Sequence, residues 1–120
     1  MATIIISGDA SHILRNEFIK YFGFNDIIHG AKFAFAFAVV KNLQPVTEKT
    51  ESGQPLTWSS DMVEPLVNVL KIVRSENNLN LTDDELLNRV RDLIHAGVYE
   101  IEKLRKENPK LTVLDLLSLE

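Results

Sequence analysis

The sequence predicts a mostly helical α+β fold, in which a short N-terminal strand is followed by two helices and then by two to three further helices. Two observations carry this prediction. Three consecutive isoleucines, Ile4–Ile6, lie in an alternating run near the start, and β-branched side chains favour a pleated strand. Most of the remaining chain has apolar residues at helical spacing, interrupted by glycine, proline and asparagine turns.

The composition is that of a globular chain. Of its 120 residues, 45% are hydrophobic, 25% are charged and none is cysteine, which excludes disulfides and a cysteine nucleophile. We recognise neither a secretory signal nor an apolar run long enough to span a membrane, so we expect a cytoplasmic protein. Residues 1–45 are expected to form a strand-helix-helix dimerisation module and residues 46–120 a helical extension packed on it, with one compact domain as the alternative.

The strand is expected to direct Ile4 and Ile6 into the core and Thr3, Ile5 and Ser7 to the other face. The first helix follows Gly8, with Asp9 or Ser11 as its N-cap, and ends at Gly23, which adopts the left-handed conformation cheaply. Its predicted apolar face consists of Ile13, Leu14, Phe18, Tyr21 and Phe22.

The second helix is predicted from Asp26 to Leu43, with Asn25 as its cap. Its phenylalanines alternate with alanines between residues 33 and 38, which read alone would indicate a strand. Alanine is a strong helix former and a poor strand former, so we favour the helix and keep the strand as the alternative. A helix that is apolar on nearly every side is typical of a buried position, such as the centre of a dimer.

Residues 44–57 are expected to form a polar loop or a short hairpin. Trp58 either packs on the core or is an exposed interface anchor. A helix capped by Ser59, Ser60 or Asp61 should then run to about Glu76, and its inward side chains are expected to be Met62, Leu66, Val69, Leu70 and Val73.

The longest helix is predicted from Asp83 to about Glu107. The sequence Thr82-Asp-Asp-Glu85 is a capping box that starts it, and Asn108-Pro109 stops it. Gly97 interrupts it at a cost of about 1 kcal/mol relative to alanine, which indicates close contact with another helix. Its inner face is expected to be Leu86, Leu87, Val90, Leu93, Ile94, Val98, Ile101 and Leu104, and a last apolar turn from Leu114 to Leu119 should follow.

No group of residues indicates catalysis. The three histidines, His12, His29 and His95, are too far apart for the spacing of a zinc site, so each is expected to be exposed or hydrogen-bonded. The acidic residues 83–85 are explained by the helix start. The chain has neither a phosphate-binding loop nor a nucleophile motif. We expect no catalytic residue, no metal, no cofactor and no enzymatic activity.

The order of strand, helix and helix over residues 2–43 resembles the ribbon-helix-helix family, whose members pair their strands across a homodimer and often place that ribbon on DNA. The resemblance implies DNA-binding positions at Thr3, Ile5, Ser7 and Asn25. It also implies a dimer interface made by Ile4, Ile6, Phe33, Phe35, Phe37 and Val39. The outward strand residues include no Arg, Lys, Asn or Gln, the types that make bidentate contacts to bases, and Asp26 would repel a phosphate.

Charge is unevenly distributed along the chain. Residues 1–45 hold four cations and three anions, whereas residues 46–120 hold nine cations and fourteen anions. Nucleic-acid binders usually present a basic surface, so the first 45 residues are the better candidate for contact with DNA. The basic tract from Lys103 to Lys110 is interleaved with glutamates and is interpreted as a solvated helix end.

Over more of the chain, the sequence resembles small accessory proteins of bacterial DNA phosphorothioation (Dnd) gene clusters. The residues that carry this resemblance are the Phe/Ala helix, Leu56-Thr-Trp58 and Ala96–Leu104. It implies a DNA-modification or phage-defence setting and supplies no catalytic residue. The first hypothesis is therefore a non-enzymatic DNA-associated accessory or regulatory protein that acts as a homodimer. The alternative is a protein-interaction module without direct DNA contact, which binds a protein partner through residues 46–120.

Overall fold

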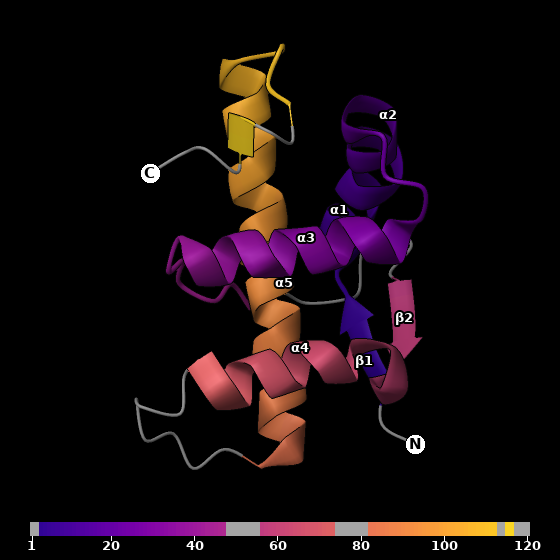
Figure 1. Cartoon of the computed structure of the whole chain (residues 1–120). Coiled ribbons are helices and arrows are strands. Elements are labelled where there is room, and N and C mark those ends of the chain that lie inside the picture. Colours follow the sequence, from indigo (N-terminus) through magenta and orange to yellow (C-terminus); the bar gives the residue numbers. More distant parts are fainter. Residues whose placement is uncertain (1–2, 48–55, 74–81, 113–114, 117–120) are drawn as a thin grey trace.

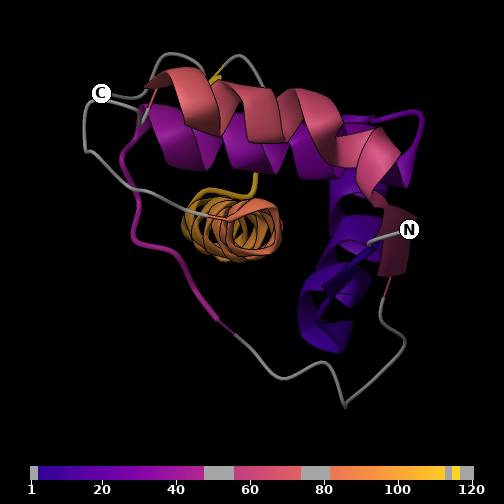
Figure 2. The ribbon, with the colours of Figure 1, turned by 90° about the horizontal axis from the view of Figure 1, so that it is seen from below.

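One long helix, α5 (Asp83–Glu107), is the centre of the fold. The computed structural model describes residues 3–47, 56–73, 82–112 and 115–116. The helices α3 (Ile27–Val40) and α4 (Ser60–Val73) both cross α5 on the same side, with α4 nearer its N-terminal end (Figure 1). Viewed along α5, the first helical segment lies beside α5, below the N-terminal end of α3 (Figure 2). The fold is mostly helical α+β, as predicted.

Two short strands form an antiparallel sheet. β1 (Thr3–Ile6) pairs with β2 (Leu56–Ser59), with Ile4 opposite Trp58 and Ile6 opposite Leu56. β1 was expected to pair with the strand of a second chain; within its own chain it forms a ladder with β2, and pairing across a dimer stays a prediction. The polar composition of residues 44–57 concealed this second strand. Trp58 is 9% exposed, which confirms the packing alternative for this side chain.

The first helical segment is continuous from Gly8 to Phe22. It comprises α1 (Gly8–Ile13), a π-helical segment η1 (Leu14–Phe18) and α2 (Ile19–Phe22). Its N-cap is Ser7, whose Oγ accepts a hydrogen bond of 3.2 Å from the Ala10 N–H, so neither Asp9 nor Ser11 is the cap. Gly23 ends the segment in the left-handed region, at φ 73°, as predicted.

The apolar face of this segment is partly as predicted. Ile13, Leu14 and Phe18 are buried, whereas Tyr21 is 48% exposed. A π-helical turn holds more residues than an α-helical turn, so residues beyond η1 no longer follow the regular helical spacing on which the prediction relied.

The Phe/Ala segment is a helix, and the strand alternative is wrong. α3 begins after Asp26, which has extended backbone at φ −144° and no side-chain capping bond; Asn25 is therefore not its cap. The alanines Ala31, Ala34 and Ala38 are fully buried. A Cβ placed on Gly97 of α5 would overlap the carbonyl group of Ala34, at 2.6 Å from its carbon. The predicted close helix contact at Gly97 is thus confirmed, and its partner is α3.

α5 follows its prediction closely. The capping box is formed, with the Glu85 N–H donating to Thr82 Oγ1 at 3.2 Å and the Thr82 N–H donating to Glu85 Oε1 at 3.1 Å. Asn108 is the C-cap. All predicted inner residues are buried except Leu104, which is half-buried: Leu86, Leu87, Val90, Leu93, Ile94, Val98 and Ile101 are 8% exposed or less.

α4 starts where predicted but presents a different face to the core. Its buried residues are Val63, Leu66 and Leu70, whereas Met62 and Val69 are 44% and 36% exposed. Both sets fit helical spacing, and packing on α5 selects the set that includes Val63. The Val73 side chain and the predicted helix end near Glu76 lie outside the described residues. So do Leu114 and Leu119 of the predicted last turn, of which Leu116 is described and is buried.

Candidate interaction surface and the buried polar network

The four predicted DNA-binding positions lie in β1, directly after it, and in the turn before α3. Ile5 is 38% exposed, but Ser7 is 1% exposed and acts as the helix cap. The backbone of Thr3 pairs with Ser59 in the sheet. Asn25 is exposed and lies in the turn before α3, away from the sheet in sequence and next to the exposed Asp26. The buried Ser7 side chain is unavailable for contact with DNA, and contact through Thr3, Ile5 and Asn25 stays a prediction.

Most of the predicted dimer-interface residues are buried within their own chain. Ile4, Ile6, Phe35 and Phe37 are 3%, 0%, 1% and 7% exposed. Their apolar surface was expected to need a second chain because residues 2–43 alone are too few to cover it. The structure covers it mainly with α5 and β2 of the same chain. The remaining two predicted residues, Phe33 and Val39, are half-buried at the border of the core.

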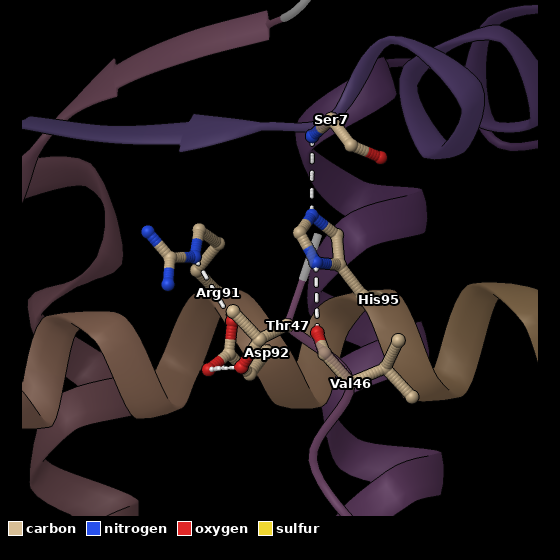
Figure 3. A network of polar contacts seen from close by, with 6 residues as sticks. All are labelled: Ser7, Val46, Thr47, Arg91, Asp92 and His95. Carbon is tan, nitrogen blue, oxygen red and sulfur yellow. Dashed lines mark hydrogen bonds and ion pairs between the residues drawn. The ribbon is translucent and has the colours of Figure 1, made fainter. Parts of the chain in front are cut away.

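A buried polar network connects three segments of the chain (Figure 3). The Ser7 N–H, at the end of β1, donates to Nε2 of His95 on α5 at 3.1 Å. His95 Nδ1 lies 3.0 Å from the carbonyl oxygen of Val46, in the segment that follows α3. A carbonyl oxygen only accepts, so Nδ1 carries the proton and the imidazole is in its neutral Nδ1–H form.

Asp92, one turn before His95, attaches the same segment to α5 a second time. The Thr47 hydroxyl donates to Asp92 Oδ2 at 2.8 Å, and the Val46 N–H donates to the Asp92 backbone carbonyl at 3.0 Å. Arg91 Nε lies 3.0 Å from Asp92 Oδ1. These contacts hold the chain after α3 against α5.

The network contains the residue types of a hydrolytic triad, but its geometry differs from one. His95 faces the backbone N–H of Ser7, whereas Ser7 Oγ accepts from Ala10 and lies 3.4 Å from the Tyr99 hydroxyl. His95 Nδ1 binds Val46 and not Asp92. A triad needs the histidine between the hydroxyl and the carboxylate. The arrangement instead joins β1, the segment after α3 and α5 to one another.

A second polar cluster connects the first helical segment to the C-terminal half of α5. Arg105 forms an ion pair with Glu17 of η1, and its guanidinium carbon lies 4.3 Å from the centre of the Tyr21 ring. Lys20 Nζ lies 5.5 Å from the same ring. Tyr21 is thus an exposed aromatic ring with two cations close to it. The lysines at positions 103, 106 and 110 of this end are also exposed.

The largest exposure of apolar side chains is on the side of α3 and α4 that faces away from α5. Val40 is 78% exposed, more than any other large hydrophobic residue described. Helical spacing places Ala36 and Phe33 near Val40 on α3, and Pro65 lies between the exposed Met62 and Val69 on α4. We call this surface the outer face; it consists of His29, Lys32, Phe33, Ala36, Val39 and Val40 of α3 and Asp61, Met62, Glu64, Pro65, Asn68 and Val69 of α4.

The outer face is what the sequence analysis missed. Two of its residues, Phe33 and Val39, were predicted to lie in a dimer interface, whereas the exposed residues of α4 were not. The available signal was the uniformly apolar composition of α3: a helix apolar on every side, with one side covered by α5, must expose the other.

The described residues offer little sign of a metal or membrane site. Within residues 3–47, 56–73, 82–112 and 115–116, no three His, Cys, Asp or Glu side chains are grouped as metal ligands would be. No described helix is long and apolar enough to cross a membrane. His12 and His29 are exposed and His95 is buried and hydrogen-bonded. Among the described carboxylates, the Thr82 N–H and hydroxyl hold the pKa of Glu85 below its ordinary value of 4.5.

The fold and surface therefore define a small, mostly helical α+β protein with a two-stranded sheet and an apolar outer face. Comparison with protein-family models, with curated proteins and with solved structures finds no match for the chain.

Proposed function

We propose that the protein is a non-enzymatic interaction module that acts as a homodimer, with the outer face as its interface. The observation that carries this proposal is the exposure of Val40, Met62 and Val69, at 78%, 44% and 36%, on two helices that lie on the same side of α5. Exposed apolar surface is costly in water and commonly marks an interaction site. The homodimer expected from the sequence is retained, but its contact surface moves from β1 to α3 and α4.

The size of the outer face sets the expected affinity. Each helix has 14 residues, which corresponds to a length of about 21 Å and a width of about 10 Å. Two such helices give a flat footprint of about 400 Å², about half of the area that each partner buries in a standard interface. The dimer should therefore be weak, with a dissociation constant in the micromolar range.

Sedimentation equilibrium from about 10 to 500 µM tests this proposal, a range chosen around a micromolar dissociation constant. The wild-type chain should approach the dimer mass at the upper end. Val40→Glu should remain monomeric, because dimerisation would bury an unpaired carboxylate. Ile19→Glu is the matched control, since Ile19 is 37% exposed and lies on α2; it should dimerise as the wild type does. A wild type that stays monomeric at the upper limit would refute the proposal.

A second candidate function is direct contact with nucleic acid, in keeping with the expected DNA-modification setting. It is favoured by the exposed Tyr21 ring close to Lys20 and Arg105, with further exposed lysines at the same end of α5. Aromatic rings beside cations can stack on unpaired bases while the cations contact phosphates.

Fluorescence anisotropy of a labelled single-stranded DNA at low salt tests this second candidate. Binding should weaken steeply as salt rises, and the double variant Lys103→Glu, Lys106→Glu should abolish it. Val40→Glu is the control and should bind as the wild type does. Absence of binding at low salt would eliminate direct contact through this end and leave the interaction module standing.

A further inference from the structure

The hydrogen bonds of His95 determine which of its ring nitrogens can take a further proton. His95 lies on α5 and is 0% exposed. Its Nδ1–H donates to the Val46 carbonyl oxygen at 3.0 Å, and its Nε2 accepts from the backbone N–H of Ser7 at 3.1 Å. Because Nδ1 already carries a proton, a second proton can be added only at Nε2. That nitrogen already faces an N–H group (Figure 3).

A protonated His95 is therefore incompatible with one of these two contacts. An imidazolium donates from both nitrogens, so Nε2–H and the Ser7 N–H would be two donors that face each other. A water molecule that accepts from both would hold the two nitrogens about 5 Å apart, whereas they now lie 3.1 Å apart. The contact with Val46 persists, because Nδ1–H donates to its carbonyl oxygen in both charge states.

The charged groups on the elements around His95 are already bonded or lie towards the surface. The Asp92 carboxylate, one turn before His95, attracts an imidazolium through space, but its two oxygens bind the Thr47 hydroxyl and Arg91 Nε. Tyr99, one turn after His95, lies 3.4 Å from Ser7 Oγ. Neither β1 nor the segment 44–47 contains a titratable side chain. The remaining titratable groups, in α1 and in or at the ends of α3, are exposed or half-buried: Asp9, His12, Asp26, His29, Lys32 and Lys41.

We propose that His95 is a pH-sensitive latch that holds the junction of β1 and α1 on α5, closed while the imidazole is neutral and open when it is protonated. An accessible histidine takes up its second proton near about pH 6.5. The closed form excludes this proton and the open form binds it, so opening becomes more favourable as pH falls below about 6.5. The latch does not depend on the homodimer proposed above.

The junction that the latch releases has its own internal bonds. Ser7 Oγ caps α1 by accepting from the Ala10 N–H. The Ser11 hydroxyl donates to the Ile6 carbonyl oxygen at 3.2 Å and accepts from the Leu56 N–H at 3.0 Å, so it connects α1 to both strands. None of these bonds involves His95. On protonation the junction should therefore move away from α5 as a unit, while the segment after α3 stays attached to α5 through Val46.

Amide hydrogen exchange of the wild-type chain at about pH 7.5 and about pH 5.0 tests the latch, in a range where histidine side chains titrate and most carboxylates do not. The protection factor of an amide, corrected for its intrinsic exchange rate at each pH, reports the opening equilibrium. A proton bound only in the open form raises the opening constant about tenfold per pH unit below 6.5, or about thirtyfold at pH 5.0. The protection factor of the Ser7 amide should therefore fall about thirtyfold.

The Val46 amide is the internal control of this measurement. It donates to the Asp92 carbonyl oxygen at 3.0 Å, and its segment keeps the Nδ1–H bond of His95, so its protection factor should change by less than about threefold. Equal losses at Ser7 and Val46 would overturn the latch, because they indicate that the whole network opens together. An unchanged protection factor at Ser7 would overturn it as well.

A variant without the titrating ring identifies the source of the pH dependence. In His95→Gln the amide oxygen can accept from the Ser7 N–H but takes no proton, so the Ser7 protection factor should change by less than about threefold between the two pH values. His12→Gln, at an exposed position, is the matched control and should keep the change of about thirtyfold. A thirtyfold change that persists in His95→Gln would overturn the role of His95.

Ring ¹⁵N spectra of the wild type give a test that needs no variant. The exposed His12 and His29 should become doubly protonated near about pH 6.5, whereas His95 in the closed form should keep its neutral Nδ1–H tautomer at about pH 5.0. A His95 ring that takes up its second proton near about pH 6.5 while the Ser7 amide keeps its full protection would overturn the proposal.

Discussion

The contact between Gly97 and Ala34 gives a prediction that can be worked out from the structure. Gly97→Ala adds one methyl group at the crossing of α5 and α3. That carbon would lie 2.6 Å from the carbonyl carbon and 3.0 Å from the Cα of Ala34, where ordinary carbon contacts need about 3.5–4.0 Å. The atoms in the way belong to the backbone of a buried helix, so relief requires the two helices to separate by about 1 Å.

The magnitude follows from two opposing terms. Overpacking of a core typically costs about 1–3 kcal/mol. Because the obstructing atoms belong to the Ala34 backbone, we expect a cost at the upper end, about 3 kcal/mol. Replacing glycine with alanine in a helix interior returns about 1 kcal/mol of helix propensity. We expect a net loss of about 2 kcal/mol in the free energy of unfolding, or about 8 °C in Tm at about 4 °C per kcal/mol.

Urea unfolding followed by circular dichroism measures this loss as a lower transition midpoint at unchanged slope. Gly30→Ala is the matched control on α3. Its new Cβ would meet only side-chain atoms, at 3.2 Å from Phe18 Cδ2 and 3.4 Å from Leu14 Cδ2, so its stability should lie within about 1 kcal/mol of the wild type. Adding Ala34→Gly to Gly97→Ala should not restore stability, because the obstacle is the Ala34 backbone. Wild-type stability of Gly97→Ala would refute the reasoning.

Two further predictions concern hydrogen-bonded groups of α5. His95→Phe leaves the Ser7 N–H and the Val46 carbonyl without their partner and should lower the free energy of unfolding by about 3 kcal/mol. His12→Phe, at an exposed position, should change the free energy of unfolding by less than about 0.5 kcal/mol. Equal effects of the two variants would contradict the role of His95. Glu85→Ala removes a carboxylate whose pKa is held below 4.5 by Thr82. The ionised capping box stabilises the fold above that pH, and its contribution is lost as pH falls through the lowered pKa. The difference in stability between the variant and the wild type, measured by thermal unfolding at several pH values, should therefore shrink below pH 4.5; a difference that grows there would contradict the assignment.

The helices could be predicted where apolar residues repeat at helical spacing over several turns or where the helix ends carry capping residues. α5 was predictable because eight apolar residues repeat at helical spacing between Leu86 and Leu104 and because Thr82 and Glu85 form a capping box. Its contact with a second helix was predictable because Gly97 has no local reason to occupy a helix interior.

Short or ambiguous patterns could not be resolved in this way. The strand β2 has four residues and follows a polar stretch, so nothing local distinguishes it from a loop. In α4, Met62 and Val63 are adjacent apolar residues, and only packing on α5 decides that Val63 is buried and Met62 exposed.

The candidate surface was the least predictable part of the molecule. The sequence indicates that α3 has apolar residues on more than one side, but it does not show which of these sides is buried by other elements of the same chain. α5 takes the side of Ala31, Ala34 and Ala38 and leaves Ala36 and Val40 exposed. Likewise, the buried role of His95 depends on Ser7 and Val46, which are far from it in sequence.

The most direct test of the outer face as a dimer interface is a dilution series followed by amide chemical shifts. Spectra of the ¹⁵N-labelled chain between about 500 and 10 µM sample the expected micromolar dissociation constant. Concentration-dependent shifts should be confined to the outer face, with Ala36, Val40 and Val69 among the largest, and should vanish in Val40→Glu. Shifts concentrated on β1 or on the first helical segment, with α3 and α4 unchanged, would contradict the account.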